Sequence, residues 1–331
     1  MKGGCRPSGR GTVDKGRSGR GIATRTNTWT GGAPYVMAFI VTVLWSSSYV
    51  LIKWGLAEIP PLFFATVRYT LAFCILLALD IAMGTSRTGK GTWGSKQTIL
   101  LVLAGLGGYT IAQGLQFVGL YYLPAITTSF LINFNPFFVL ILGVWLLREG
   151  TSITQLGGLG IALLGAWAFF SQQGPMGGQA FGILIVIISG LGWACYVVVV
   201  RMLQRSGNVD SLRLTTATVG IGVVGMIALT VVTGQYAPLT PRGILIIVWL
   251  ATANTVLAFF IWNWCLKSIP AYELTVFQDL MLVETAIFAF VFLQEAITPL
   301  MVGGMALVTI GVLVVQLRAS RGMPRLPKSL P

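Results

Sequence analysis

A segment of about forty residues occurs twice in this 331-residue chain. Leu-Pro-Ala at residues 123–125 aligns with Ile-Pro-Ala at residues 269–271, and the alignment continues without a gap at a shift of 146 positions. Glycines stay in register far downstream, where Gly165 aligns with Gly311. A period of this length indicates two copies of one unit, and duplicated hydrophobic segments are typical of membrane transporters that hold substrate between their repeats.

Composition indicates that most of the chain is surrounded by lipid. Hydrophobic residues make up 55% of the sequence, charged residues make up 9%, and the mean hydropathy is +0.82. Soluble domains contain about 25% charged residues. The chain has no histidine, which excludes His-dependent triads and His-ligated metal sites, and its four cysteines show no CxxC spacing. We therefore expect neither a cofactor nor a metal site.

Hydrophobic runs predict the fold class. Each of ten runs is long enough to cross about 30 Å of hydrocarbon as a helix. The runs are approximately 35–57, 61–83, 97–121, 124–146, 151–171, 180–203, 210–233, 242–266, 271–293 and 298–317. Because most connections are too short to hold a domain, the sequence predicts an all-α integral membrane protein with ten transmembrane helices.

Basic residues predict the orientation of these helices. Most of the 22 Lys and Arg residues lie in the two tails and in the connections near Lys96 and Arg201. The positive-inside rule then places both termini in the cytoplasm, and it explains the formal charge of +13 without a nucleic-acid partner. We expect residues 1–33 to be a disordered basic tail and residues 319–331 to be a second basic tail. The expected location is the cell (plasma or inner) membrane.

The two copies divide the helices equally. Residues 34–171 form the first five-helix repeat, and residues 179–318 form the second. An odd number of helices makes the second copy enter the membrane from the opposite face. The repeats are therefore expected to be inverted, with a pseudo-two-fold axis in the membrane plane.

Short motifs recur in the two halves. Trp45 with Lys53 eight residues later resembles Trp193 with Arg201. Further motif residues of the first half are Ser46, Pro61, Arg68, Pro136, Glu149, Gly157, Gly158 and Gly165. In this order the chain from about residue 35 to 317 resembles the drug/metabolite transporter (DMT) superfamily, and within it the EamA-type transporters. The second copy departs from that pattern, because Leu282 aligns with Pro136.

This resemblance implies export or exchange of small organic metabolites, often amino acids. The solute would pass through a central cavity that is lined by helices from both repeats. The resemblance also implies that the helix containing Pro136 bends, whereas Leu282 leaves the corresponding bend of the second copy undecided.

Ionisable residues at membrane depth are the first candidates for solute binding or ion coupling, because charge is costly there. Glu284 lies near the predicted midplane and is the preferred candidate for coupling to protons. Asp279 lies five residues earlier, so a rotation of roughly 140° keeps the two acids from sharing one helix face. Arg68 is expected either to bind a substrate carboxylate or to form a supporting salt bridge, and Glu284 is one partner that it could reach. For each acid the alternative is an interhelical polar contact.

Polar and aromatic residues on paired helices predict a cavity. Asn133 aligns with Asp279, so the same level of the two helices is polar in both halves. The candidate residues for substrate binding or coupling are Trp45, Tyr49, Arg68, Tyr109, Gln113, Asn133, Asn135, Trp193, Tyr196, Asn254, Gln278, Asp279 and Glu284. Such a mixed lining suits an organic solute, although any one aromatic residue could instead serve packing. The glycine-rich runs 151–171 and 298–317 predict closely packed helices.

The sequence thus predicts a secondary transporter that moves amino acids or similar small metabolites by alternating access, in the direction of export. Its expected partners are the solute, the lipid bilayer and protons, and we expect a monomer. A passive channel or facilitator is the first alternative. An intramembrane enzyme is less favoured, since the chain lacks histidine and the GxGD motif and places its two acids on different faces.

Overall fold

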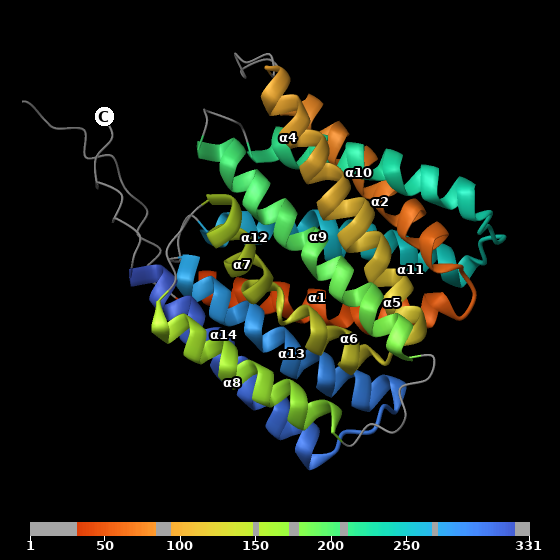
Figure 1. The fold of residues 1–331 in the computed structure, drawn as a ribbon. Helices are drawn as coiled ribbons and strands as arrows, with labels where there is room; N and C mark the ends of the chain where they lie inside the picture. The colour runs from red at the N-terminus through yellow and green to blue at the C-terminus, as the bar shows by residue number, and fades with distance from the viewer. Residues whose placement is uncertain are drawn as a thin grey trace, which may run out of the picture.

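The computed structural model of the chain describes residues 32–83, 94–147, 152–171, 179–205, 211–266 and 271–321. Throughout these ranges every regular element is a helix, and the helices form one bundle (Figure 1). Nine helical stretches in the described ranges are long and apolar enough to cross a membrane. Most of both expected tails, and Glu149, lie outside the described residues.

The helices follow the hydrophobic runs within a few residues. The elements of the first half are α1 (Ala33–Leu56), α2 (Pro61–Ala82), α4 (Ser95–Gly105), the π-helix η1 (Leu106–Gln113), α5 (Gly114–Tyr122), α6 (Ala125–Ile132), α7 (Asn135–Leu147) and α8 (Ile153–Phe170). Those of the second half are α9 (Gln179–Arg205), α10 (Ser211–Thr233), α11 (Pro241–Ala251), the π-helix η2 (Thr252–Leu257), α12 (Ala258–Leu266), α13 (Ala271–Leu293) and α14 (Pro299–Arg321). Prolines begin α2, α11 and α14, because the first helical position requires no backbone donor.

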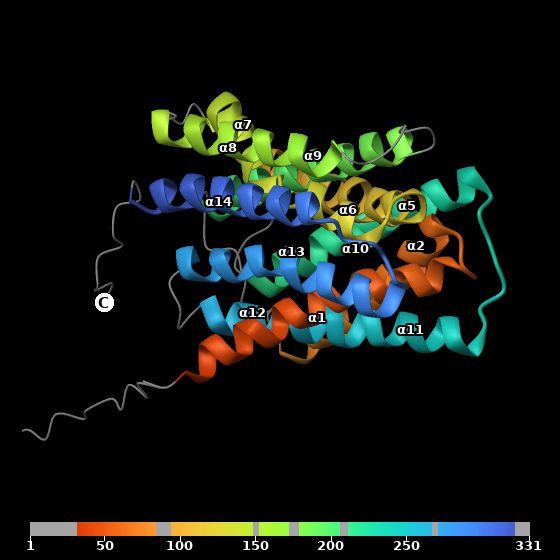
Figure 2. The ribbon, with the colours of Figure 1, turned by 90° about the horizontal axis from the view of Figure 1, so that it is seen from below.

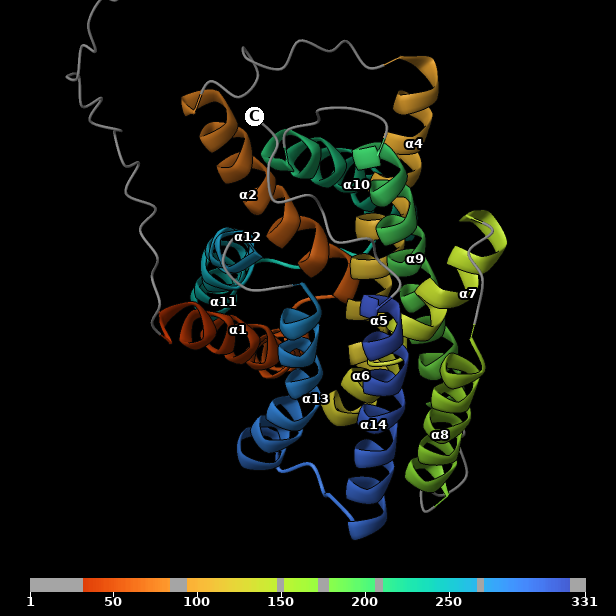
Figure 3. The same cartoon turned by 90° about the vertical axis from the view of Figure 1, so that its left-hand side faces the viewer.

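Neighbouring helices are mostly drawn from different halves of the chain. α1 packs along α13, α2 packs along α10, and η1 packs against α9. Figures 2 and 3 show α8 lying beside α14. The core of the bundle is therefore an interface between the halves, and any internal space lies between them.

Glycines set the distance between α8 and α14. A Cβ atom at Gly158 would lie 2.7 Å from the Gly311 carbonyl oxygen, and one at Gly165 would lie 2.7 Å from that of Gly304. Only glycine permits such backbone contact, which confirms the close packing predicted for these two helices. The contacts run in opposite order along the two helices, so α8 and α14 are antiparallel.

Two π-helical segments interrupt spans that are otherwise α-helical. η1 begins at Leu106 and η2 begins at Thr252, which is 146 positions later and thus the shift that aligns the sequence repeats. π-Helical turns are rare and are frequently found at functional sites. Nothing in the hydrophobic pattern predicted them, because a single wider turn hardly changes the helical period.

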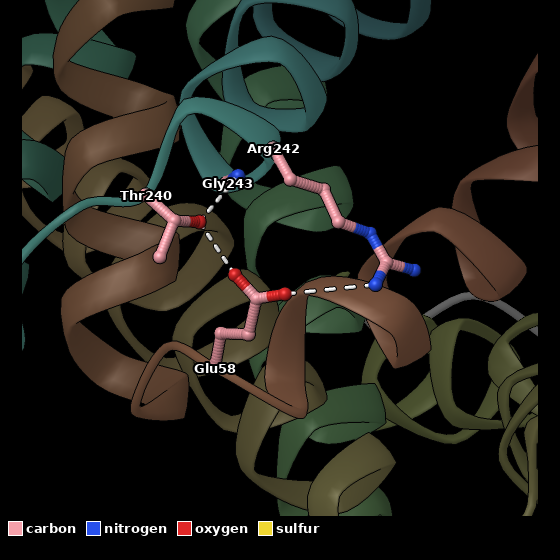
Figure 4. Close-up of polar contacts among 4 residues, drawn as sticks. All are labelled: Glu58, Thr240, Arg242 and Gly243. Carbon is pink, nitrogen blue, oxygen red and sulfur yellow. Dashed lines mark hydrogen bonds and ion pairs between the residues drawn. The ribbon is translucent and has the colours of Figure 1, made fainter.

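One end of the bundle is closed by contacts between its turns. Glu58 follows α1, accepts a hydrogen bond from the Thr240 hydroxyl and lies 3.6 Å from Arg242 (Figure 4). The Thr240 hydroxyl in turn accepts a 3.0 Å hydrogen bond from the backbone N–H of Gly243, which caps α11. We call this end, where α1 meets α2 and α11 begins, the closed end.

The closed end also joins α6 to the connection between α13 and α14. The carboxylate of Glu295 accepts hydrogen bonds of 2.6 and 3.0 Å from the backbone N–H groups of Ala125 and Ile126. An anion at a helix N-terminus is stabilising because these N–H groups have no partner inside the helix. Leu120 and Leu123 are fully buried beside this contact, so the end is packed as well as capped.

Candidate functional site

A cavity of about 1140 Å³ lies inside the bundle. Its lining comes from both halves of the chain, as the aligned polar positions predicted. Of the thirteen candidate residues, twelve line it: Trp45, Tyr49, Arg68, Tyr109, Gln113, Asn133, Asn135, Trp193, Tyr196, Asn254, Gln278 and Asp279. Glu284 does not.

The cavity extends to one end of the bundle and stops short of the other. Toward the closed end its lining stops near Ile52 and Gln116, and fully buried Leu120 lies beyond. In the other direction the lining continues to Ser152 at the start of α8 and to Arg201 near the end of α9. The cavity therefore extends to the end of the bundle opposite the closed end, which we call the open end.

A row of aromatic rings forms one wall of the cavity. The rings of Tyr69 and Tyr109 are 5.8 Å apart, those of Tyr109 and Tyr196 are 5.7 Å apart, and those of Tyr196 and Trp193 are 5.1 Å apart. The Tyr69 hydroxyl donates a 2.7 Å hydrogen bond to the Gln113 side chain. The row runs from α2 across η1 to α9 and offers an apolar surface with fixed polar groups.

A second aromatic group lies around Trp45 of α1. Its ring centroid is 5.8 Å from that of Phe259 and 5.0 Å from that of Trp262. The indole N–H donates to the Asn254 backbone carbonyl at 3.2 Å, and the Asn254 amide donates to the Leu44 carbonyl. Asn254 thus joins η2 to α1 through its backbone carbonyl and its side-chain nitrogen, while its side-chain oxygen Oδ1 is buried without a partner.

The fourth span is broken where it meets the cavity. α6 ends at Ile132 and α7 begins at Asn135, directly before Pro136. Proline lacks the N–H that a continuous helix would need, and it disfavours helical backbone in the residue before it. Asn133 and Asn135 flank the break, and the amide oxygen of each is buried without a hydrogen-bond partner.

Arg68 does not pair with Glu284, contrary to one possibility raised by the sequence. Its guanidinium donates a 3.2 Å hydrogen bond to the Thr255 hydroxyl of η2. Its central carbon lies 5.2 Å from the ring of Tyr69 and 5.6 Å from that of Phe117. No carboxylate of the described residues is within ion-pair distance of this guanidinium.

Glu284 and Asp279 of α13 face different neighbours, as their spacing predicted. The Glu284 carboxylate accepts hydrogen bonds from Thr42 at 2.9 Å and Ser46 at 2.8 Å, and both donors belong to α1. Asp279 lines the cavity instead, and one of its oxygens is buried with no hydrogen-bond partner. The structure therefore brings Asp279, and not Glu284, to the space that a solute would occupy.

Several lining residues were not among the sequence candidates. They include Tyr69, Thr255, Phe259 and Trp262. The repeat register could have indicated two of them, because Thr255 and Phe259 lie 146 positions after Tyr109 and Gln113. Within the described residues no group of three or more His, Cys, Asp or Glu side chains could hold a metal ion. The chemistry on offer is hydrogen bonding, charge and aromatic surface.

A helical membrane bundle with a polar cavity between its two halves defines a multi-pass membrane transporter. The chain belongs to the EamA-like transporter family, whose profile matches residues 33–171 and again residues 180–317. The resemblance to EamA-type transporters of the drug/metabolite transporter superfamily, inferred from the motifs, is thereby confirmed.

Several proteins of known sequence are similar over most of their length. An uncharacterized transporter of Archaeoglobus fulgidus is 28% identical over 273 residues, which cover 79% of this chain and 89% of that protein. Proteins named probable amino-acid metabolite efflux pump are 24% identical in Salmonella typhimurium and 24% identical in Escherichia coli, and each match covers 84% of this chain and 93% of the relative. A solved crystal structure shares the fold, with a TM-score of 0.60 at 18% identity, over 88% of this chain and 98% of that one.

Proposed function

We propose that this protein is a secondary transporter that exports amino acids or similar small metabolites by alternating access. The observation that carries the proposal is the cavity between the two halves, in which oxygens of Asn133, Asn135, Asn254 and Asp279 are buried without partners. Unpaired polar groups at membrane depth are costly, so they are expected where a solute or water engages them. Two relatives named as amino-acid metabolite efflux pumps support the solute class.

The proposal includes ten transmembrane helices arranged as two inverted repeats. The antiparallel contact of α8 with α14 supports it, because their glycines align in the repeat register. Gly158 meets Gly311 and Gly165 meets Gly304, which is the reciprocal pattern that a two-fold axis produces. The equal register of η1 and η2 supports the same relation.

In alternating access the cavity opens to one side of the membrane at a time. The closed end blocks a continuous pore, which argues against a passive channel. By the positive-inside rule the open end, where Arg201 lies, faces the cytoplasm. The structure would then represent the inward-open state, and both termini would be cytoplasmic. In a variant whose only cysteine replaces Ser95, an impermeant maleimide should fail to label intact cells, and strong labelling would reverse this orientation.

Transport in sealed vesicles tests the function. Purified protein should accumulate a labelled amino acid or metabolite saturably and leave it chemically unaltered. Uptake without saturation would indicate a channel, and an altered product would indicate an enzyme.

Two tryptophan substitutions on α7 test whether the solute uses the cavity. Val139→Trp fills the cavity from α7 and should stop uptake, whereas Ile141→Trp on the same helix, at a position that is 55% exposed, should not. If the two variants transport equally, the solute does not use this cavity.

Proton coupling is tested at Glu284, which joins α13 to α1 through Thr42 and Ser46. Glu284→Gln should abolish accumulation driven by a pH gradient and leave exchange of solute across the membrane. Gradient-driven accumulation at the wild-type level in this variant would show that Glu284 is not required for proton coupling.

A further inference from the structure

The cavity contains few charges. In the described lining the charged side chains are Arg68, Asp279 and Arg201. Arg201 lies toward the open end of α9, whereas Arg68 and Asp279 are only 6% and 5% exposed. One buried cation and one buried acid therefore face the same space from α2 and α13.

Among the described residues, Arg68 has no counter-ion. The guanidinium stays protonated, and its described contacts are the Thr255 hydroxyl and the rings of Tyr69 and Phe117. Its Nε atom is buried without a hydrogen-bond partner. A buried cation is strongly stabilised by an anion that it can hydrogen-bond, and a carboxylate fits the planar guanidinium with two parallel bonds.

Asp279 also lacks a hydrogen-bond partner at one of its atoms. One carboxyl oxygen is buried with no hydrogen-bond partner, and its polar neighbour is Gln316 of α14. Within the described residues no lysine or arginine lies within ion-pair distance of this carboxyl group. Asp279 therefore has room and unused hydrogen-bonding capacity for a cationic group from the solute.

The Arg68 side chain extends inward toward the level of Asp279. Arg68 itself is seven residues, about 11 Å, from the start of α2 at the closed end. The Arg68 side chain reaches Thr255, which is 14 residues from the start of α11 at the closed end. Asp279 is 14 residues from the end of α13, which also lies at the closed end. At the helical rise per residue both positions are about 21 Å from that end. Arg68 and Asp279 therefore face the inner section of one cavity from two helices.

Aromatic rings form two walls of the cavity. Trp45 lies against Phe259 and Trp262 on one side, and the row that contains Tyr109 and Tyr196 lies on the other. Aromatic faces suit a hydrocarbon side chain and also attract an ammonium group. A solute with two opposite charges and an apolar body would match Arg68, Asp279 and the aromatic walls.

We propose that Arg68 and Asp279 are the specificity-determining pair of the cavity, binding the carboxylate and the ammonium group of one α-amino acid with an apolar side chain. The inference rests on the proposed transport function and adds the solute class and its orientation. Neither charge alone would select an amino acid, because a simple acid satisfies Arg68 and a simple amine satisfies Asp279.

Equilibrium binding to the purified protein in detergent tests the pair separately from transport. The probes are leucine, 4-methylpentanoate and isopentylamine, which share the hydrocarbon body and differ in their charged groups. Leucine should bind at least about tenfold more tightly than either analogue, since each analogue leaves one buried charge unpaired. Equal binding of leucine and one analogue, or no binding of leucine, would overturn the proposal. Saturable vesicle uptake of another solute would then leave the transport function standing.

Two variants assign the roles. Arg68→Gln should remove the preference for leucine over isopentylamine and keep the preference over 4-methylpentanoate, and Asp279→Asn should do the reverse. A merely structural role would weaken all three probes alike, and that result would contradict the assignment. Glu58→Gln and Arg242→Gln are the matched controls, because they remove the same kinds of charge at the closed end and should leave all three affinities unchanged. If a cavity variant does not fold, the wild-type series still decides between a zwitterion and a singly charged solute.

Discussion

The fourth and ninth hydrophobic runs of the sequence align in the repeat, yet the helix of one is broken and that of the other is continuous. α6 and α7 are separated at residues 133–134, whereas α13 runs without interruption from Ala271 to Leu293. The position that separates them is Pro136, which aligns with Leu282. Leu282 is buried and packs in the core, so the second copy uses this position for helix packing rather than for a bend.

Both spans nevertheless present polar groups at the same level of the cavity. The broken span does so with Asn133 and Asn135, whose amide oxygens are free beside the break. The continuous span does so with Asp279, a charged side chain on intact helix. The comparison teaches that the halves have kept the polar level of the site while changing its charge and its backbone.

The largest effect is expected from imposing the break on the intact span. Leu282→Pro removes a helical hydrogen bond in the middle of α13 and places a ring against the preceding turn, which should lower stability by about 3 kcal/mol or more. Pro136→Leu should change stability by less than about 1 kcal/mol, because proline there is near the start of α7. Melting temperature and the monodisperse fraction in detergent measure both. Equal losses would show that this position does not cause the difference.

The second-largest effect is expected at the glycine contacts between α8 and α14, where the two halves are alike. Gly158→Ala and Gly304→Ala should each destabilise the bundle by about 1–3 kcal/mol, because the added methyl groups meet the backbones of Gly311 and Gly165. Gly157→Ala and Gly303→Ala are the controls, since a Cβ atom at these glycines has nothing within 4 Å. Thermal unfolding of the four variants should therefore separate into two pairs. A large difference between the stability losses of Gly158→Ala and Gly304→Ala would show that the two halves are not equivalent at this contact.

A smaller effect is expected at the N-terminus of α6, which Glu295 caps. Glu295→Gln replaces a carboxylate that accepts hydrogen bonds from Ala125 and Ile126 with a neutral amide, and it should cost about 1 kcal/mol. Glu58→Gln, which disrupts an exposed ion pair with Arg242, should cost less. Thermal unfolding at low and high salt measures both. A loss at Glu58 that exceeds the loss at Glu295 would contradict the capping role.

The smallest change in stability is expected at the break itself. Asn133→Leu keeps the side-chain volume and removes an amide whose oxygen has no partner, so stability should change by less than about 1 kcal/mol. Vesicle uptake should nevertheless fall, because the cavity loses a hydrogen-bonding group. Loss of folded protein in a size-exclusion profile would instead assign Asn133 to packing.

The sequence predicted the helices well because hydrophobic length and proline position act locally. Twelve of its thirteen candidate residues line the cavity, since polar residues in lipid must face a cavity or each other. It did not identify the partners in contacts between distant helices, such as Glu284 with Thr42 and Arg68 with Thr255. Helix periodicity gives the face of a residue but not the neighbour that the face meets. The two π-helical segments were missed because one wider turn leaves hydropathy unchanged.

The register of η1 and η2 has a consequence for the ancestry of the chain. π-Helical residues account for well under 1% of residues in proteins, so two segments that begin 146 positions apart are poorly explained by independent origin. The register therefore indicates that the wide turn was already present in the unit that was duplicated. Because both halves line the cavity, one copy of that unit would supply only part of the lining.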